Sequence, residues 1–166
     1  MKLYLVNPSN DDGDGLDGEG FRQMKLVARR LILDRVSVDR VYANGRLVSA
    51  QSGDILSKAL RAPLIRDERF VEFNIMQSSD FIVDTENLES IYAFVDELLM
   101  RGKDAIIIMG GGIHRAVISR LTGMSLADTR HFELMPSSIS VVQYNKDITN
   151  GWRIQSINDT THLLVP

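Results

Sequence analysis

The sequence of 166 residues contains no cysteine. Disulfide bonds, iron–sulfur clusters and thiolate nucleophiles are therefore excluded. The sequence also lacks an apolar run long enough to cross a membrane, and it turns polar at Asn7, before the apolar core of a signal peptide could form. These absences predict a cytoplasmic protein with no membrane association.

A strong excess of charge of either sign is also missing. Lys and Arg number 19 against 22 Asp and Glu, so the formal net charge is −3. A mildly acidic chain argues against a nucleic-acid partner and against an anionic membrane surface. With 44% hydrophobic and 25% charged residues, the composition is that of an ordinary globular protein. We expect one domain over residues 1–166, with a core that needs no cross-links.

What the sequence does contain is a regular alternation of two apolar patterns. Short apolar runs that are typical of strands cover residues 2–6, 38–43, 64–65, 105–108, 139–144 and 152–157. Helical periodicity lies between them, over residues 21–32, 50–60, 88–99 and 113–121. This order predicts a three-layer α/β/α sandwich with a mostly parallel central sheet that ends in a hairpin.

The first predicted helix has apolar residues on one face and basic residues on the other. We expect Phe21, Met24, Leu31 and Ile32 to face the core. The arginines and the lysine of the same segment should face solvent.

The chain is organised around a strand, a glycine turn and a helix at residues 104–120. Four apolar residues are followed closely by Gly110, Gly111 and Gly112, and the helical pattern begins after them. At the carboxyl edge of a parallel sheet, backbone N–H groups of such a turn can hold an anion, with Arg115 assisting. The same turn can also be purely structural, which is the interpretation we favour.

An acidic, glycine-rich loop over residues 10–20 raises the question of a calcium site. An EF-hand loop that began at Asp12 would need oxygen ligands at its fifth and twelfth positions, where the sequence has Leu16 and Gln23. The pattern fails, so we predict neither a metal nor a cofactor. If this loop lies at the same sheet edge as Gly110, its carboxylates disfavour an anionic substrate.

Seven segments, spread over nearly the whole chain, resemble segments of the histidine phosphatase superfamily, also called the phosphoglycerate mutase-like fold. Residues 3–6 (LYLV) resemble the strand before the Arg-His-Gly signature of that family. Residues 16–23 (LDGEGFRQ) are similar to its Leu-Thr-Glu-x-Gly-x-x-Gln helix start. Residues 107–112 (IIMGGG), followed by Arg115 and Ala116, resemble its Val-Val-Ser-His-Gly-Gly…Arg-Ala segment. The other similar segments are residues 41–56, 67–74, 137–142 and 156–163.

The resemblance implies a catalytic set of two histidines, two arginines and a carboxylate, in which one histidine is the phosphorylated nucleophile. Asn7, Pro8 and Ser9 stand where the arginine, histidine and glycine of the signature are expected. A proline ring cannot accept a phosphoryl group. Because phosphoryl transfer depends on positioned cations, the loss of the signature arginine also removes stabilisation of the transition state.

Two of the remaining catalytic positions that the resemblance implies have also lost their catalytic residue. Ala50 falls at the second arginine and Gly110 at the second histidine, and only Glu72 is retained, as the implied general acid. We therefore expect a degenerate member of the family that has no phosphatase or mutase activity and acts as a binding or regulatory module. The predicted pocket consists of Asn7, Pro8, Ser9, Ala50, Gly110, Gly111 and Arg115.

Two alternatives stay open. An enzyme that acts on a small phosphorylated metabolite could use Glu72, Ser9 or His114 in new roles. Alternatively, the pocket is vestigial and the protein is an interaction subunit, for which a homodimer is one candidate assembly. The candidate partners are thus a small anionic metabolite or a protein. Of the histidines, we expect His114 on a helix flank, His131 at the surface, and His162 in a hydrogen bond that supports the fold.

Overall fold

The computed structural model describes residues 1–9, 15–70, 85–149 and 151–164. The first half of the chain contains β1 (Lys2–Val6), α1 (Gly18–Leu33), β2 (Arg40–Ala43), α2 (Leu47–Leu60) and β3 (Leu64–Arg66). The second half contains α3 (Thr85–Arg101), β4 (Ala105–Ile108), α4 (Gly111–Thr122), the 3-10 turn η1 (Asp128–His131), β5 (Ile139–Tyr144), β6 (Trp152–Asp159) and the 3-10 turn η2 (Thr161–Leu164). Helices and strands alternate in the predicted order.

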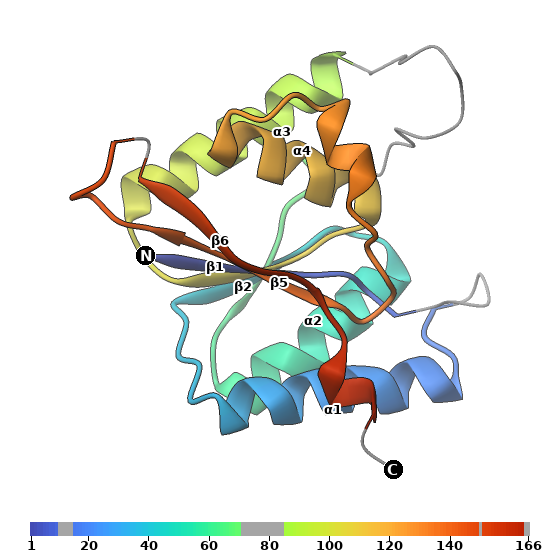
Figure 1. Cartoon of the computed structure of the whole chain (residues 1–166). Coiled ribbons are helices and arrows are strands. Elements are labelled where there is room, and N and C mark those ends of the chain that lie inside the picture. The colour runs from blue at the N-terminus through green and yellow to red at the C-terminus, as the bar shows by residue number, and fades with distance from the viewer. Residues whose placement is uncertain (10–14, 71–84, 150, 165–166) are drawn as a thin grey trace.

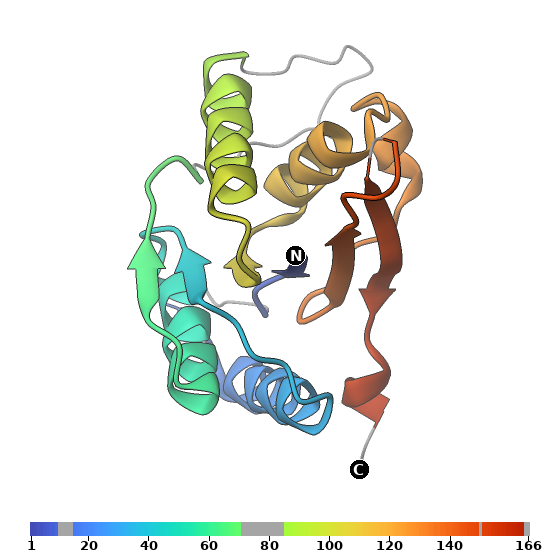
Figure 2. The same cartoon turned by 90° about the vertical axis from the view of Figure 1, so that its left-hand side faces the viewer.

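The strands form one sheet of six strands in the order β3-β2-β4-β1-β5-β6, seen end-on in Figure 2. β3, β2, β4 and β1 are parallel, whereas β5 runs antiparallel to β1 and β6 antiparallel to β5. The predicted mostly parallel sheet with a terminal hairpin is confirmed. Val6 lies opposite Ile108 in the register, so β1 and β4 end together at one edge of the sheet.

Helices cover both faces of the sheet and make three layers, as predicted (Figure 1). α1 and α2 pack on one face, and α3 and α4 pack on the other. Ile106 and Ile108 of β4 belong to the core under α1 and α2, whereas Ile107 belongs to the core under α3 and α4. A strand covered on both sides must be apolar at every position, which explains the unbroken run of residues 105–108.

Helix α1 begins at a polar N-cap residue and buries only a narrow stripe of its apolar side chains. The Asp17 carboxylate accepts a hydrogen bond of 2.6 Å from the Gly20 N–H, which satisfies one free donor of the first turn. Met24 is fully buried, but Phe21 is 38% and Ile32 52% exposed. The prediction that Phe21 and Ile32 face the core is therefore wrong.

Element boundaries differ from the predicted ones by a few residues. α2 begins at Leu47 rather than at residue 50, so Ala50 lies near its first turn. Gly102 follows α3 with φ +62, the left-handed conformation that favours glycine after a helix. Among the helices that the structure describes, none is both long and apolar enough to span a membrane.

Candidate functional site at the carboxyl edge of the sheet

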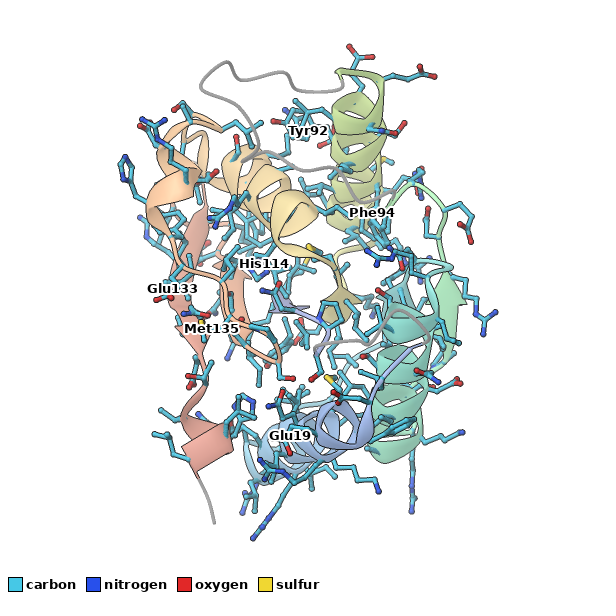
Figure 3. The ribbon with its side chains drawn as sticks, turned by 90° about the vertical axis from the view of Figure 1, so that its right-hand side faces the viewer. Glu19, Tyr92, Phe94, His114, Glu133 and Met135 are labelled. Atoms are coloured by element: carbon cyan, nitrogen blue, oxygen red, sulfur yellow. The ribbon has the colours of Figure 1, made fainter. Side chains whose placement is uncertain are left out.

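The candidate site lies where the parallel strands end, and Figure 3 views this edge directly. Asn7 follows β1, Asn44 follows β2, and Gly110 precedes α4. Gly110 is the N-cap residue of α4 and provides no side chain to accept from the first-turn N–H groups. His114 lies near the centre of this view, with Glu133 and Met135 to one side and Glu19 below, on α1.

Both ends of the Asn7 side-chain amide form hydrogen bonds within the protein. Its Nδ2 donates to the Met135 carbonyl at 3.1 Å, and its Oδ1 lies 2.9 Å from Nδ1 of His114. The backbone N–H of Asn7 donates to the Ser138 carbonyl at 3.0 Å. The side chain is only 4% exposed. The position that the resemblance gives to an arginine thus holds a buried amide that joins β1, α4 and the segment before β5.

His114 is fully buried, although we expected it on a helix flank. Because the Asn7 amide nitrogen donates to Met135, the Asn7 oxygen must be the acceptor toward His114, so Nδ1 of His114 carries the proton. Nε2 is then an acceptor, and it has no hydrogen-bond partner in the described part of the chain. Burial, with a smaller contribution from the nearby Arg115 charge, lowers the pKa of His114 to about 3. The imidazole is therefore neutral at physiological pH.

Pro8 and Ser9 also form hydrogen bonds that join the end of β1 to other segments of the chain. The Ser9 hydroxyl donates to Oε1 of Gln23 at 2.8 Å, and the Ser137 hydroxyl donates to the same oxygen at 3.2 Å. The Pro8 carbonyl accepts from the Ser137 N–H at 3.3 Å. An amide oxygen is not a general base, so these contacts do not activate Ser9 as a nucleophile.

The remaining predicted pocket residues lie on α2 and α4. Ala50 is 6% exposed in α2, and Gly111 is half-buried at the start of α4. Arg115 donates from Nη1 to the carbonyls of Thr129 and Phe132, both at 2.6 Å, so its guanidinium holds the η1 segment. Burial lowers the pKa of Arg115. Glu72 lies outside the described residues.

The charges around this edge are largely engaged with one another. Arg69, which follows β3, pairs with Asp67 and with Glu97, each at 2.7 Å. These two carboxylates raise the pKa of Arg69. Glu19 pairs with Arg22 at 2.7 Å, and the hydrogen bond from Arg22 lowers the pKa of that carboxyl. No group of three or more metal-ligating side chains occurs among the described residues.

Gln23 and Asn44 were not predicted as site residues, yet both shape this edge. Gln23 accepts the two serine hydroxyls described above, and Nδ2 of Asn44 donates to the Phe70 carbonyl at 2.8 Å. A signal was available in both cases: Gln23 ends the segment 16–23 that carries the resemblance, and Asn44 directly follows a strand. Neither feature alone distinguishes a ligand contact from a fold-supporting contact.

Comparisons with known proteins agree with this architecture. The family model "Histidine phosphatase superfamily (branch 1)" matches residues 85–160. The solved structure of alpha-ribazole phosphatase from Shigella flexneri is 16% identical, with 96% of each chain covered and a TM-score of 0.77. Phosphoserine phosphatase from Entamoeba histolytica is 15% identical over 98% of each chain, with a TM-score of 0.76. A search of curated protein sequences found no match.

A mycobacterial glucosyl-3-phosphoglycerate phosphatase gives a similar result, with 12% identity over 95% of this chain and 98% of that chain, and a TM-score of 0.76. At these identities the likeness shows the fold: an α/β/α protein with a phosphoglycerate mutase-like sheet. The match to the family model is limited to residues 85–160, less than half of the chain.

Proposed function

We propose that this protein is a catalytically degenerate member of the histidine phosphatase superfamily that binds a ligand at the carboxyl edge of its sheet without transforming it. The observation that carries the proposal is the end of β1. Asn7 and Ser9 occupy two positions of the expected signature, and both are bonded to the protein's own interior. Pro8 stands where the nucleophile is expected, and its side chain has no nucleophilic atom.

The energetic argument concerns the charge that develops during phosphoryl transfer. Losing one positioned hydrogen-bond donor to that charge raises a barrier by about 2.7–4 kcal/mol. Two arginines near this edge are already engaged: Arg115 donates to backbone carbonyls, and Arg69 is held by two carboxylates. Neither guanidinium is available to take over the role of a signature arginine.

The same edge keeps features that suit binding. The first N–H groups of α4 have no side-chain cap from Gly110, and a helix N-terminus favours an anionic or electron-rich group. Gly111 adds no side chain that would cover these donors. The ligand that we propose is a small metabolite that receives backbone hydrogen bonds and is not attacked.

The test combines an activity assay with a binding assay on the same preparation. We expect no release of phosphate from p-nitrophenyl phosphate or from a panel of phosphorylated metabolites. We also expect at least one member of the panel, or its dephosphorylated counterpart, to raise the melting temperature. Robust turnover that is abolished by Glu72→Gln would refute the proposal.

One observation favours the alternative of an enzyme with relocated residues. The unprotonated Nε2 of His114 is the form that a general base requires. Its pKa of about 3 nevertheless makes it a weak base at neutral pH. If the alternative holds, His114→Gln removes turnover, whereas His131→Gln, at an exposed position, leaves turnover unchanged.

A further inference from the structure

A concave site lies between helix α1 and the 3-10 turn η2. A cavity of about 270 Å³ is lined by Leu26, Arg29, Arg30, Leu33, Thr161 and His162. Its walls thus come from the second half of α1 and from η2, which pack against each other. None of these residues belongs to the predicted pocket at the carboxyl edge.

Hydrogen bonds and ion pairs of Arg30 hold the two elements that line this cavity in place. Arg30 pairs with Asp34 at 2.6 Å, donates to the Thr161 hydroxyl at 2.8 Å, and lies 3.4 Å from an oxygen of Asp159. One guanidinium therefore connects α1 to η2 and to the end of β6. A cavity with preformed walls loses little conformational entropy when a group enters it.

Exposed apolar side chains occur on both elements that line this cavity. Leu33 is 68% exposed and the neighbouring Ile32 is 52% exposed, on the face of α1 that the sequence pattern assigned in part to the core. Leu164, just after His162 in η2, is 80% exposed. α1 therefore carries more apolar surface than the described fold covers, and such surface beside a cavity marks an interaction site.

The charge at this rim is opposite to that of the whole chain. In the described part of the chain, Lys25 and Arg29 make no ion pair or hydrogen bond, whereas Arg22 and Arg30 are paired with carboxylates. The protein has a formal net charge of −3. Two uncommitted cations beside apolar surface therefore complement a partner that carries carboxylates around an apolar group.

The size of the cavity narrows the choice of the group that can enter it. Ligand pockets for small molecules typically hold about 300–1,000 Å³, so 270 Å³ suits one large side chain better than a whole ligand. Nε2 of His162 donates to the Ser137 carbonyl at 2.9 Å, and Nδ1 has no partner in the described residues. Among the side chains, tryptophan has the largest apolar ring system, and its size suits this volume best.

We propose that the α1–η2 cavity, lined as described above, is a docking site for an acidic segment of a partner protein. The segment inserts one aromatic residue, with tryptophan the best fit, between Leu26 and Leu33. Carboxylates beside that residue pair with Lys25 and Arg29.

The test uses three labelled peptides of equal length and fluorescence anisotropy with the full chain. The first has a central Trp flanked by Glu, the second the same Trp flanked by Lys, and the third a central Ala flanked by Glu. We expect the first peptide to bind about tenfold or more tightly than either of the others, because a buried anchor residue and its charge pairs dominate such interfaces.

Variants of the protein locate the site. Leu33→Glu should abolish binding of the Trp–Glu peptide, whereas Met100→Glu, an exposed apolar position on α3, should leave binding unchanged. Arg29→Glu should weaken binding of the Trp–Glu peptide and strengthen binding of the Trp–Lys peptide. Lys58→Glu on α2 should change the binding of neither peptide. All four positions are exposed, so circular dichroism should show an unchanged fold.

Three outcomes would overturn the proposal. The first is equal binding of the Trp–Glu and Ala–Glu peptides. The second is that Met100→Glu and Lys58→Glu weaken binding as much as the variants at the cavity. The third outcome is a dimer in sedimentation that Leu33→Glu converts to a monomer, which would assign this surface to a second copy of the chain.

Discussion

The contact between Asn7 and His114 places two polar side chains in the interior, where each constrains the other. The Met135 carbonyl orients the Asn7 amide, and that amide in turn decides which imidazole nitrogen carries the proton. Residues 107 positions apart in the sequence thus share one hydrogen-bond network. Ionisation of His114 would put two donors on a buried ring that has an acceptor for only one.

This network predicts a pH dependence of stability. The unfolded imidazole titrates near 6.5 and the folded one near 3, so between these values the unfolded state binds the extra proton. Stability therefore rises with pH from about 3 to 6.5, by up to about 1.4 kcal/mol per pH unit from this group. Burial also lowers the pKa of His162, which adds to the same trend.

Urea unfolding at several pH values measures this slope. His114→Gln should flatten it in part, leaving the contribution of His162, whereas His131→Gln at the surface should keep the slope of the original protein. An unchanged slope in His114→Gln would contradict the contribution assigned to His114.

The burial of His114 shows why the candidate site was only partly predictable. The glycine turn and Arg115 were predicted from a local strand–turn–helix pattern, and the end of β1 was predicted from the family resemblance. The partner of His114, by contrast, lies just after β1, far away in the sequence. Local periodicity contains no information about which polar residues meet across the fold. The same limit applies to Arg115, whose carbonyl acceptors lie 14 and 17 residues further along the chain.

At the scale of single elements, α1 depends on both its cap and its packing. Asp17 caps the helix, while Met24, Val27 and Leu31 fill its contact with the rest of the core. Periodicity correctly predicted a helix here. It assigned too wide an apolar face, because the pattern cannot show how much of a helix its neighbours cover.

The N-cap residue Asp17 allows a prediction that distinguishes the capping hydrogen bond from the charge of the carboxylate. Asp17→Ala should destabilise the protein by about 1 kcal/mol, because the Gly20 N–H loses its acceptor. Asp17→Asn retains a good capping oxygen and should cost much less. Equilibrium unfolding in urea compares the two variants, and equal losses would show that the carboxylate charge, rather than the hydrogen bond, is what matters.

At the scale of the whole molecule, the sheet separates two cores. Val27 of α1 belongs to the core on one face, and Val95 of α3 belongs to the core on the other. Both side chains are fully buried. Alternation of strands and helices sufficed to predict this three-layer arrangement. The strand order across the sheet could not be predicted, because an apolar run does not show which other strands will pair with it.

The separation of the two cores predicts additivity. Val27→Ala and Val95→Ala should each cost about 2 kcal/mol, since each removes two buried methyl groups from a packed layer. The double variant should lose the sum to within about 0.5 kcal/mol, because the two sites share no contacts. Chemical denaturation of the three variants tests this, and a coupling energy well above that margin would mean that the sheet transmits strain between the layers.

The central position of β1 has a consequence for how the chain reaches this fold. β1 is made first during synthesis, but its two neighbours are β4, which begins at Ala105, and β5, which begins at Ile139. β2, α2 and β3 can associate locally, whereas β1 must wait for residues about 100 and 137 positions away. Such long-range pairing slows folding. A ribosome-bound chain shorter than these positions therefore holds an unpaired apolar strand that requires protection from aggregation.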